Sequence, residues 1–144
     1  MTDLNEIADE LRNFYLRAHR AIDRAMKMEG VSLARAKLLK FIANEGAARS
    51  ADIGTTFGFS PRTVTEAIDA LERDGLVQRT PDPSDRRAKR LSITPAGEAA
   101  LAASEPVRQK FLTEVFGILS DEERQALSRA LHKMNDRLEQ IDVD

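Results

Sequence analysis

The chain has 144 residues, no cysteine and a formal net charge of −2. Its length suits one compact domain, or a small domain with extra helices for self-association, and excludes two large domains. The lack of cysteine excludes disulfides, thiolate catalysis, thiol redox sensing and cysteine-ligated zinc, and the slight acidity argues against a protein that coats nucleic acid through bulk positive charge.

The sequence gives no sign of a membrane, secretory or catalytic function. Its first ten residues, MTDLNEIADE, are acidic where a signal peptide would be basic, and no window approaches the roughly 18 uncharged apolar residues of a membrane span. His19 and His132 are the only histidines, and no nucleophile is paired with a base. We therefore expect a cytoplasmic protein that is not an enzyme and needs no cofactor or metal.

Two helices are predicted in the first third of the chain. The first has one apolar stripe with steps of three and four that ends near Gly30: Leu4, Ile7, Leu11, Tyr15, Ala18, Ile22 and Met26. The second begins after Ser32, whose side chain can cap it, and stops at Gly46. Its apolar residues cover more than one stripe, so we expect it to be buried on several sides.

A helix, a turn and a second helix are predicted to follow. The first is expected to have Ser50 as its cap, and the turn lies at Gly58-Phe59. The second helix has Ser60 as its N-cap, Pro61 at its first position and its end at Gly75. Four of its apolar residues follow the i, i+3, i+4, i+7 pattern and should face inward: Val64, Ala67, Ile68 and Leu71.

The opposite face of this second helix is polar and charged. Its outward residues are Arg62, Glu66, Asp69 and Arg73, with Thr63 and Thr65 on the flanks. Taken alone, this face is explained by a solvated surface with ion pairs between residues four apart, 62 with 66 and 69 with 73. The hairpin that follows favours a different interpretation.

Positive charge is concentrated at the tip of that hairpin. Two strands are expected at residues 76–80 and 90–94, where apolar and polar residues alternate. From 79 to 90 the chain has five cations and two acids, and four of the cations stand between Arg86 and Arg90. Like charges so close together repel one another and gain nothing from an isolated fold, so they favour a polyanionic partner.

Two more helices complete the chain. Thr94-Pro95 repeats the cap-and-proline pattern and begins a long helix, which Pro106 should kink or interrupt. Ser120 and Glu123 form a capping box for the last helix. This helix has an apolar seam suited to packing against a partner helix: Leu127, Leu131, Met134, Leu138 and Ile141.

Together these elements predict a mainly α-helical protein with a small two- or three-stranded β-sheet. A helix-turn-helix followed by a hairpin is the layout of a winged helix-turn-helix, whose second helix enters the major groove of DNA while the hairpin reaches an adjacent groove. We expect an N-terminal dimerisation helix at 1–30, the DNA-binding winged helix-turn-helix at 31–95 and C-terminal dimerisation helices at 96–144.

The predicted DNA contacts lie on the second helix and on the hairpin tip. They are Ser60, Arg62, Thr63, Thr65 and Glu66 on the helix, and Asp85, Arg86, Arg87, Lys89 and Arg90 on the tip. Arginines at such a tip suit phosphates or a narrowed minor groove, where the negative potential is strongest. The alternative is a winged helix that binds protein rather than DNA, which the overall acidity and Glu66 keep open.

Two segments, ADIGTTFGFSPRTVTEAIDALERDGLVQR and DRRAKRLSITPAG, resemble the MarR family of transcriptional regulators. The D-x-R pattern of the family's wing is met by Asp85-Arg86-Arg87, and the L-E-x-x-G-L that ends its recognition helix by residues 71–76. The resemblance covers essentially the whole chain. It implies a homodimer formed through the terminal helices, a pseudo-palindromic DNA operator, and a repressor that a small anionic aromatic ligand releases.

Two departures from the family pattern matter. Glu66 stands where many relatives have a basic residue, and glutamate can accept a hydrogen bond from cytosine but cannot contact phosphate favourably, so the operator sequence cannot be borrowed. The absence of cysteine excludes the family's oxidant sensing. Candidate contacts for an aromatic carboxylate are Arg12, Tyr15 and His19 of the first helix, although amphipathic side chains lining an interface explain the same pattern.

Overall fold

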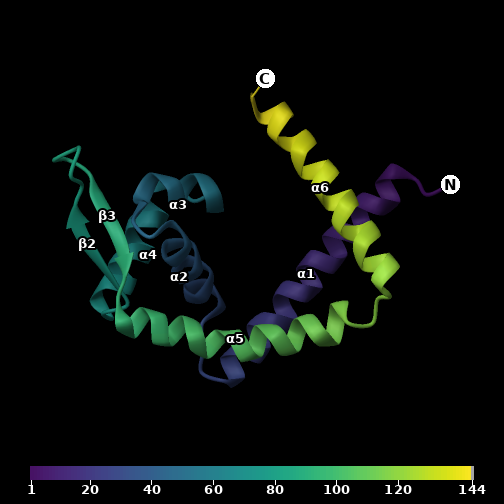
Figure 1. The fold of residues 1–144 in the computed structure, drawn as a ribbon, viewed down its shortest axis with the longest axis horizontal. Helices are drawn as coiled ribbons and strands as arrows, with labels where there is room; N and C mark the ends of the chain where they lie inside the picture. The colour runs from purple at the N-terminus through teal and green to yellow at the C-terminus, as the bar shows by residue number, and fades with distance from the viewer. Residues whose placement is uncertain (144) are drawn as a thin grey trace. The chain divides into compact units, whose positions relative to one another are not determined.

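The computed structural model describes residues 1–143, which form six helices and three strands (Figure 1). In chain order these are α1 (Leu4–Met28), α2 (Leu33–Glu45), β1 (Ala48–Arg49), α3 (Ser50–Phe57), α4 (Pro61–Arg73), β2 (Val77–Pro81), β3 (Lys89–Ile93), α5 (Pro95–Phe116) and α6 (Asp121–Val143). The predicted class, mainly α-helical with a small β-sheet, is confirmed.

Residue contacts divide the chain into two compact units, Met1–Val107 and Arg108–Asp144. The first unit contains α1, the helix-turn-helix, the sheet and the first part of α5, and the second contains the end of α5 and α6. The whole candidate site therefore belongs to one unit. The division into parts at 1–30, 31–95 and 96–144 stays a prediction.

The helix ends follow the capping signals, with one shift. The hydroxyl of Ser32 accepts the N–H of Arg35 at 3.3 Å, and that of Ser60 accepts the N–H of Thr63 at 3.2 Å. The prediction of Ser50 as a cap was wrong by one residue. Arg49 is the N-cap, and its backbone N–H donates to the side-chain carboxylate of Asp52 at 3.4 Å. At this helix start the acceptor is therefore a carboxylate and not the hydroxyl of a serine cap.

One apolar core joins α2, α3, α4 and the sheet. Its best-buried large side chains are Leu39, Ile42, Ile53, Ile68, Leu71 and Leu91, each at most 1% exposed. The predicted inward face of α4 is confirmed, since Val64, Ile68 and Leu71 are buried and Ala67 is half-buried against them. The opposite face of α4 must then point to solvent, because a helix with one buried stripe exposes the other side.

The sheet is antiparallel with the strand order β1-β3-β2. Strands β2 and β3 form the predicted hairpin, displaced by one residue from the ranges 76–80 and 90–94. Strand β1 has only two residues, Ala48 opposite Leu91 and Arg49 opposite Arg90. A two-residue strand has no alternation to recognise, and its partner lies some forty positions away, so the sequence pattern did not locate it.

Helix α5 begins as predicted but is not interrupted at Pro106. The hydroxyl of Thr94 accepts the N–H of Gly97 at 3.1 Å and donates to the carbonyl of Gly75 at 2.6 Å, which joins the helix start to the end of α4. The helix continues through Pro106 to Phe116, so an interruption there is wrong, while a kink at Pro106 stays a prediction. A proline removes one hydrogen bond of the ladder, and the helical residues on both sides maintain the rest.

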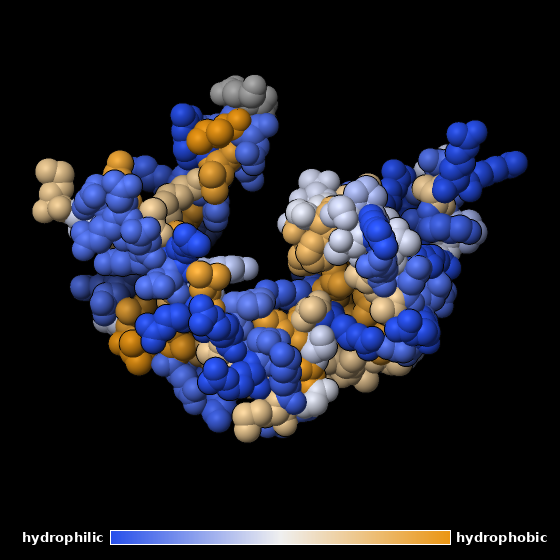
Figure 2. Space-filling view, turned by 180° about the vertical axis from the view of Figure 1, so that it is seen from behind, coloured by the Kyte–Doolittle hydropathy of each residue, from blue (hydrophilic) through white to orange (hydrophobic). Residues whose placement is uncertain are grey.

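Apolar side chains remain exposed along α6. The predicted capping box starts this helix, with Ser120 and Glu123 exchanging hydrogen bonds of 3.0 and 3.2 Å. The seam residues are 37 to 54% exposed, and Figure 2 shows apolar side chains on the surface of α6. Helix α1 also exposes Leu4, Ile7, Leu11, Phe14 and Tyr15.

Across the described residues, no helix is long and apolar enough to cross a membrane.

Gly97 gives a direct test of how α5 packs on the hairpin. A Cβ at this buried position would overlap the carbonyl oxygen of Leu76 and lie 2.7 Å from Cγ1 of Ile93. We expect Gly97→Ala to destabilise the protein by about 2 kcal/mol or more, because backbone must move. Gly54→Ala is the control, since its Cβ meets neighbours at 3.4 and 3.5 Å, and the gain in helix propensity should at least offset that contact. Chemical denaturation measures both, and a Gly97→Ala variant as stable as wild type would contradict this packing.

Candidate nucleic-acid interface

The N-terminal half of α4 presents the predicted contact residues on one exposed surface. Arg62, Thr63, Thr65 and Glu66 are all exposed, as is Ser60 at the helix cap. Nε of Arg62 lies 3.1 Å from the carboxylate of Glu66, so the predicted pair between positions 62 and 66 is confirmed. Both partners are well over half exposed, and an exposed pair of this kind is weak enough to exchange for other partners.

Two acids further along α4 share one arginine of the sheet. One guanidinium nitrogen of Arg79, on β2, lies 2.6 Å from Asp69, and the other lies 3.0 Å from Glu72. The predicted ion pair between Asp69 and Arg73 is therefore wrong. Nε of Arg73 instead lies 3.7 Å from Oδ1 of Asp74. Through these contacts Arg79 fixes α4 against the hairpin and offsets one of the two negative charges on a surface that would otherwise repel phosphate more strongly.

A buried carboxylate holds the base of the hairpin. The side chain of Asp82, directly after β2, is fully buried. Its Oδ2 lies 2.9 Å from Nε of Arg90 and 2.9 Å from a terminal nitrogen of Arg49, and its Oδ1 accepts the N–H and the hydroxyl of Ser84, both at 2.8 Å. The two hydrogen bonds from Ser84 are the chief cause that holds the pKa of Asp82 far below its usual range, aided by Arg90 and Arg49 against the effect of burial.

The tip, residues 82–88, and Lys89 at the start of β3 expose positive charge. Asp85 braces the tip, since its side chain accepts the N–H of Arg87 at 3.0 Å. Arg86, Arg87 and Lys89 are exposed and have no acidic partner among the described residues. Figure 2 shows a strongly hydrophilic hairpin tip. Cations left unpaired on a polar surface suit a partner that brings its own negative charge.

Arg90 differs from the other predicted contacts. Its guanidinium binds Asp82 and also donates to the carbonyl of Ala47 at 3.2 Å. The side chain is two-thirds buried. The structure thus places Arg90 within the base of the hairpin, in contact with the segment before β1, rather than at the exposed tip.

A pocket of about 430 Å³ lies between α1, α2 and the start of α4. Tyr15 and His19 line it, with ring centroids 6.2 Å apart, and Nζ of Lys37 lies 3.4 Å from Nδ1 of His19. Phe59 and Thr63 line the side of the pocket next to the exposed N-terminal half of α4. Of the three predicted ligand contacts, the structure brings Tyr15 and His19 together here, while Arg12 is exposed and does not line the pocket.

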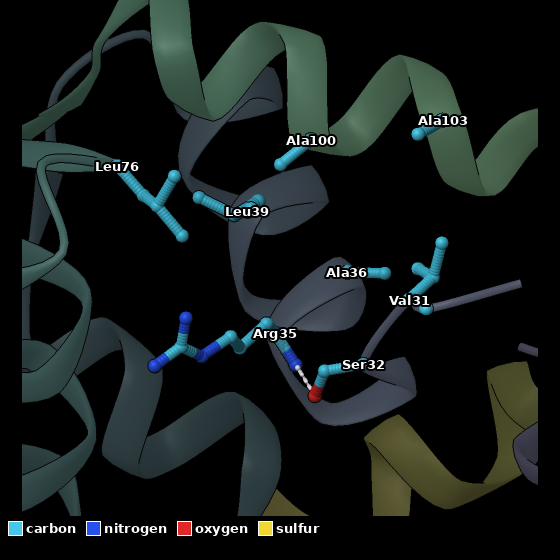
Figure 3. Close-up of a pocket in the computed structure, with 9 residues that line it drawn as sticks. Val31, Ser32, Arg35, Ala36, Leu39, Leu76, Ala100 and Ala103 are labelled. Atoms are coloured by element: carbon cyan, nitrogen blue, oxygen red, sulfur yellow. Dashed lines mark hydrogen bonds between the residues drawn. The ribbon is translucent and has the colours of Figure 1, made fainter. Parts of the chain in front are cut away.

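A second pocket, of about 390 Å³, lies between the start of α2 and the first part of α5. Figure 3 shows its apolar walls, with Leu39 and Leu76 facing each other and Ala100 above them. Its cation, Arg35, forms an ion pair with Asp74 at the end of α4. An arginine that already has a carboxylate partner gains less from a second anion than Lys37 of the first pocket, which has no acidic partner among the described residues.

Several of these residues were not identified from the sequence. Arg79 and Asp82 were included only in the charge count for residues 79–90. No role was assigned to Arg49 or Lys37. Hairpin register could have placed Asp82 beside Arg90, because Pro81 pairs with Lys89. Arg49 and Lys37 act through contacts between distant segments, for which a single sequence has no periodic signal.

The chain is similar in sequence and in fold to known proteins. A family model described as the MarR family matches residues 31–89. The chain is 35% identical over 72 residues to YsmB of Bacillus subtilis, named as an uncharacterized HTH-type transcriptional regulator. That alignment covers 50% of this chain and 49% of YsmB, so the chain matches about half the length of that relative.

Two solved structures share the fold over nearly the whole chain. The first is BpsR of Bordetella bronchiseptica, in a study of how 6-hydroxynicotinic acid regulates its DNA binding, with a TM-score of 0.78, 26% identity and coverage of 94% of this chain and 98% of BpsR. The second is a cysteine-to-serine mutant of MarR from E. coli in complex with operator DNA, with a TM-score of 0.73, 21% identity and coverage of 92% and 99%. At 21% identity the second likeness shows the fold alone.

Asp82 predicts how stability depends on pH. Because its pKa is lower in the folded than in the unfolded chain, its contribution is complete above about pH 4 and is lost as the pH falls toward the folded value. Asp74, whose pKa Arg35 lowers, adds to the same trend. We expect the Tm to drop below about pH 4, and Asp82→Asn to show a weaker dependence there. Circular dichroism melts at a series of pH values measure this, and equal slopes for both proteins would contradict it.

Proposed function

Because the chain belongs to the MarR family of DNA-binding transcriptional regulators, we propose that it acts as a homodimeric repressor that a small anionic aromatic ligand releases from its operator. Its site of action is then the cytoplasm, where a bacterial-type regulator meets DNA. The observation that carries the proposal is the arrangement of charge: Arg86, Arg87 and Lys89, at and beside the hairpin tip, have no acidic partner among the described residues, while Asp69 and Glu72 of α4 share an arginine of the sheet.

Each part of the site has a role in this proposal. Helix α4 enters the major groove, where Arg62 can bind guanine and Glu66 can accept from the amino group of cytosine once their mutual pair opens. The hairpin tip reaches the adjacent minor groove, which Arg87 enters and where Arg86 lies close to phosphate. Arg90 stays in the base of the hairpin and supports these contacts without making one.

Two copies of the chain are needed to read a pseudo-palindromic operator. Terminal helices with long exposed apolar stripes fit a self-complementary interface, in which the same surfaces of two protomers meet. The two recognition helices then face one side of the duplex, with half-sites about 10 base pairs apart.

The effector site we propose is the pocket between α1, α2 and α4. Lys37 offers a cation without an acidic partner among the described residues, and the Tyr15 and Phe59 rings offer faces for a planar ligand. Thr63, which lines the pocket, also shares a hydrogen bond of 2.9 Å with the cap residue Ser60. A ligand bound here would therefore touch the start of the recognition helix, which gives it a means to favour one arrangement of α4 over another.

The proposal predicts that Arg87 and Lys89 contribute differently to DNA binding. Arg87→Ala should weaken operator binding by about 1 to 3 kcal/mol and reduce the preference for A·T-rich flanks, because an arginine in a narrow minor groove recognises its shape. Lys89→Ala should weaken binding to all sequences alike and reduce the salt slope by about one unit.

Fluorescence anisotropy at several salt concentrations separates these effects. Lys133→Ala, on the exposed surface of α6, is the control for removal of a cation outside the site, and melting temperatures check folding. If Arg87→Ala binds operator as tightly as wild type, the assignment of the wing is wrong.

The exposed apolar stripes predict a homodimer as the folded species at micromolar concentration. Light scattering should give about twice the chain mass of 16.0 kDa. Replacing two seam residues, Leu131 and Leu138, with aspartate should shift the protein to monomer or unfold it, because charge would enter the interface. A wild-type particle near 16.0 kDa would count against the dimer.

The effector pocket predicts a specific role for Lys37. Among hydroxybenzoic acids and 6-hydroxynicotinic acid, a compound that binds should raise the Tm and lower affinity for DNA. Lys37→Met should weaken its binding by about 10- to 100-fold, as loss of a charged hydrogen bond does, while DNA binding without ligand persists. Lys40→Met, an exposed lysine of the same helix outside the pocket, is the control. If no compound in the panel shifts Tm or DNA binding, the effector proposal fails while the DNA-binding proposal stands.

A further inference from the structure

The hairpin tip has little of its own to keep it in one conformation. Residues 83–87 are all exposed, and the closing backbone bonds, from Asp82 to Ala88 and from Ala88 to Asp85, are 3.2 Å long. A hairpin that buries no apolar side chain at its tip is marginal in water. The cations that the tip carries also repel one another, which favours open conformations.

Asp82 joins this tip to two other segments. Arg90, from β3, and Arg49, from β1 and the cap of α3, both reach the same carboxylate oxygen at 2.9 Å. Arg90 also binds the carbonyl of Ala47, just before β1. The carboxylate therefore connects the start of the tip, the central strand and the beginning of the helix-turn-helix.

We infer that Asp82 is the positioning residue of the wing, which holds the tip in a DNA-ready conformation and fixes it to the helix-turn-helix through Arg49 and Arg90. This inference rests on the proposed function, because it gives Asp82 its effect on DNA through Arg87. A tip held in place before binding loses less conformational entropy when it enters a groove. Asp82 itself is buried and makes no contact with DNA.

The charge of Asp82, and not only its hydrogen-bonding capacity, is what the geometry requires. An asparagine could still accept the N–H of Ser84, but its amide would present no anion to two guanidinium groups. Removing one partner from a buried ion cluster leaves uncompensated charge, which costs more than the cluster contributes in net stability. Arg49 and Arg90 would then turn toward solvent and release the base of the wing.

A DNA-free experiment tests the positioning directly. In the wild-type homodimer, the amides of residues 82–88 should exchange hydrogen more slowly than in Asp82→Asn by about 10-fold or more, with α4 protected equally in both. Asp74→Asn is the matched control, because Asp74 also lies beside two arginines, Arg35 and Arg73, at a junction between elements. It should lower the Tm without changing exchange at the wing.

DNA binding supplies the second readout. Asp82→Asn should weaken operator binding by about 10-fold and remove the preference for A·T-rich flanks, as Arg87→Ala does. Because both changes act on one contact, the double variant should bind no more than about twofold worse than Arg87→Ala alone. Additive losses, or a retained flank preference in Asp82→Asn, would overturn the inference.

The two readouts separate this inference from the proposed function. If the wing amides exchange faster in Asp82→Asn but neither wild type nor variant binds DNA, the proposed function fails while the positioning of the tip stands. If Asp82→Asn does not fold, Arg49→Gln replaces it, since the side chain of Arg49 is nearly half exposed and Arg90 remains on the carboxylate. Arg49→Gln should speed wing exchange and lower operator affinity in the same direction, and unchanged exchange would overturn the inference.

Discussion

The packing of one apolar stripe of α4 against the core is the constraint on which the recognition surface depends. Val64, Ile68 and Leu71 are buried against α2, α3 and the sheet. Arg62 and Glu66 lie on the opposite face of the helix and are therefore exposed to solvent. Ser60 and Pro61 fix where the helix begins, and Arg79 ties its outer face to β2. The chemistry that α4 offers is thus set by its buried side, because the buried side determines its rotation and its exposed residues follow.

A slightly acidic protein can bind a polyanion if its acidic side chains are paired within the fold while some of its cationic side chains stay exposed and free of acidic partners. Here the acids closest to the site have internal partners: Asp69 and Glu72 share Arg79, and Asp82 is buried between two arginines. The cations at the hairpin tip have no such partners among the described residues. The same ion pairs that stabilise the fold therefore leave a local excess of positive charge, where net charge alone would predict repulsion.

Local signals in the sequence predicted most of the fold, and long-range contacts account for what they missed. The i, i+3, i+4, i+7 pattern placed the buried face of α4, and Ser60-Pro61 and Ser120 placed two helix starts, because these features depend on neighbours within one turn. The two-residue strand β1 pairs with a strand some forty positions away, and the contact of Arg49 with Asp82 spans more than thirty positions. Charge counting placed Arg90 at the tip, whereas its guanidinium lies in the base of the hairpin, and only the hairpin register distinguishes these positions.

Binding of α4 and the wing of two copies to one face of duplex DNA can be measured by hydroxyl-radical footprinting on an operator selected from randomised duplexes. We expect two protected stretches related by two-fold symmetry, about 10 base pairs apart, with protection of the flanking minor groove that weakens as salt rises. Absence of protection even at low salt would rule out this mode of DNA binding and would favour a winged helix that binds protein.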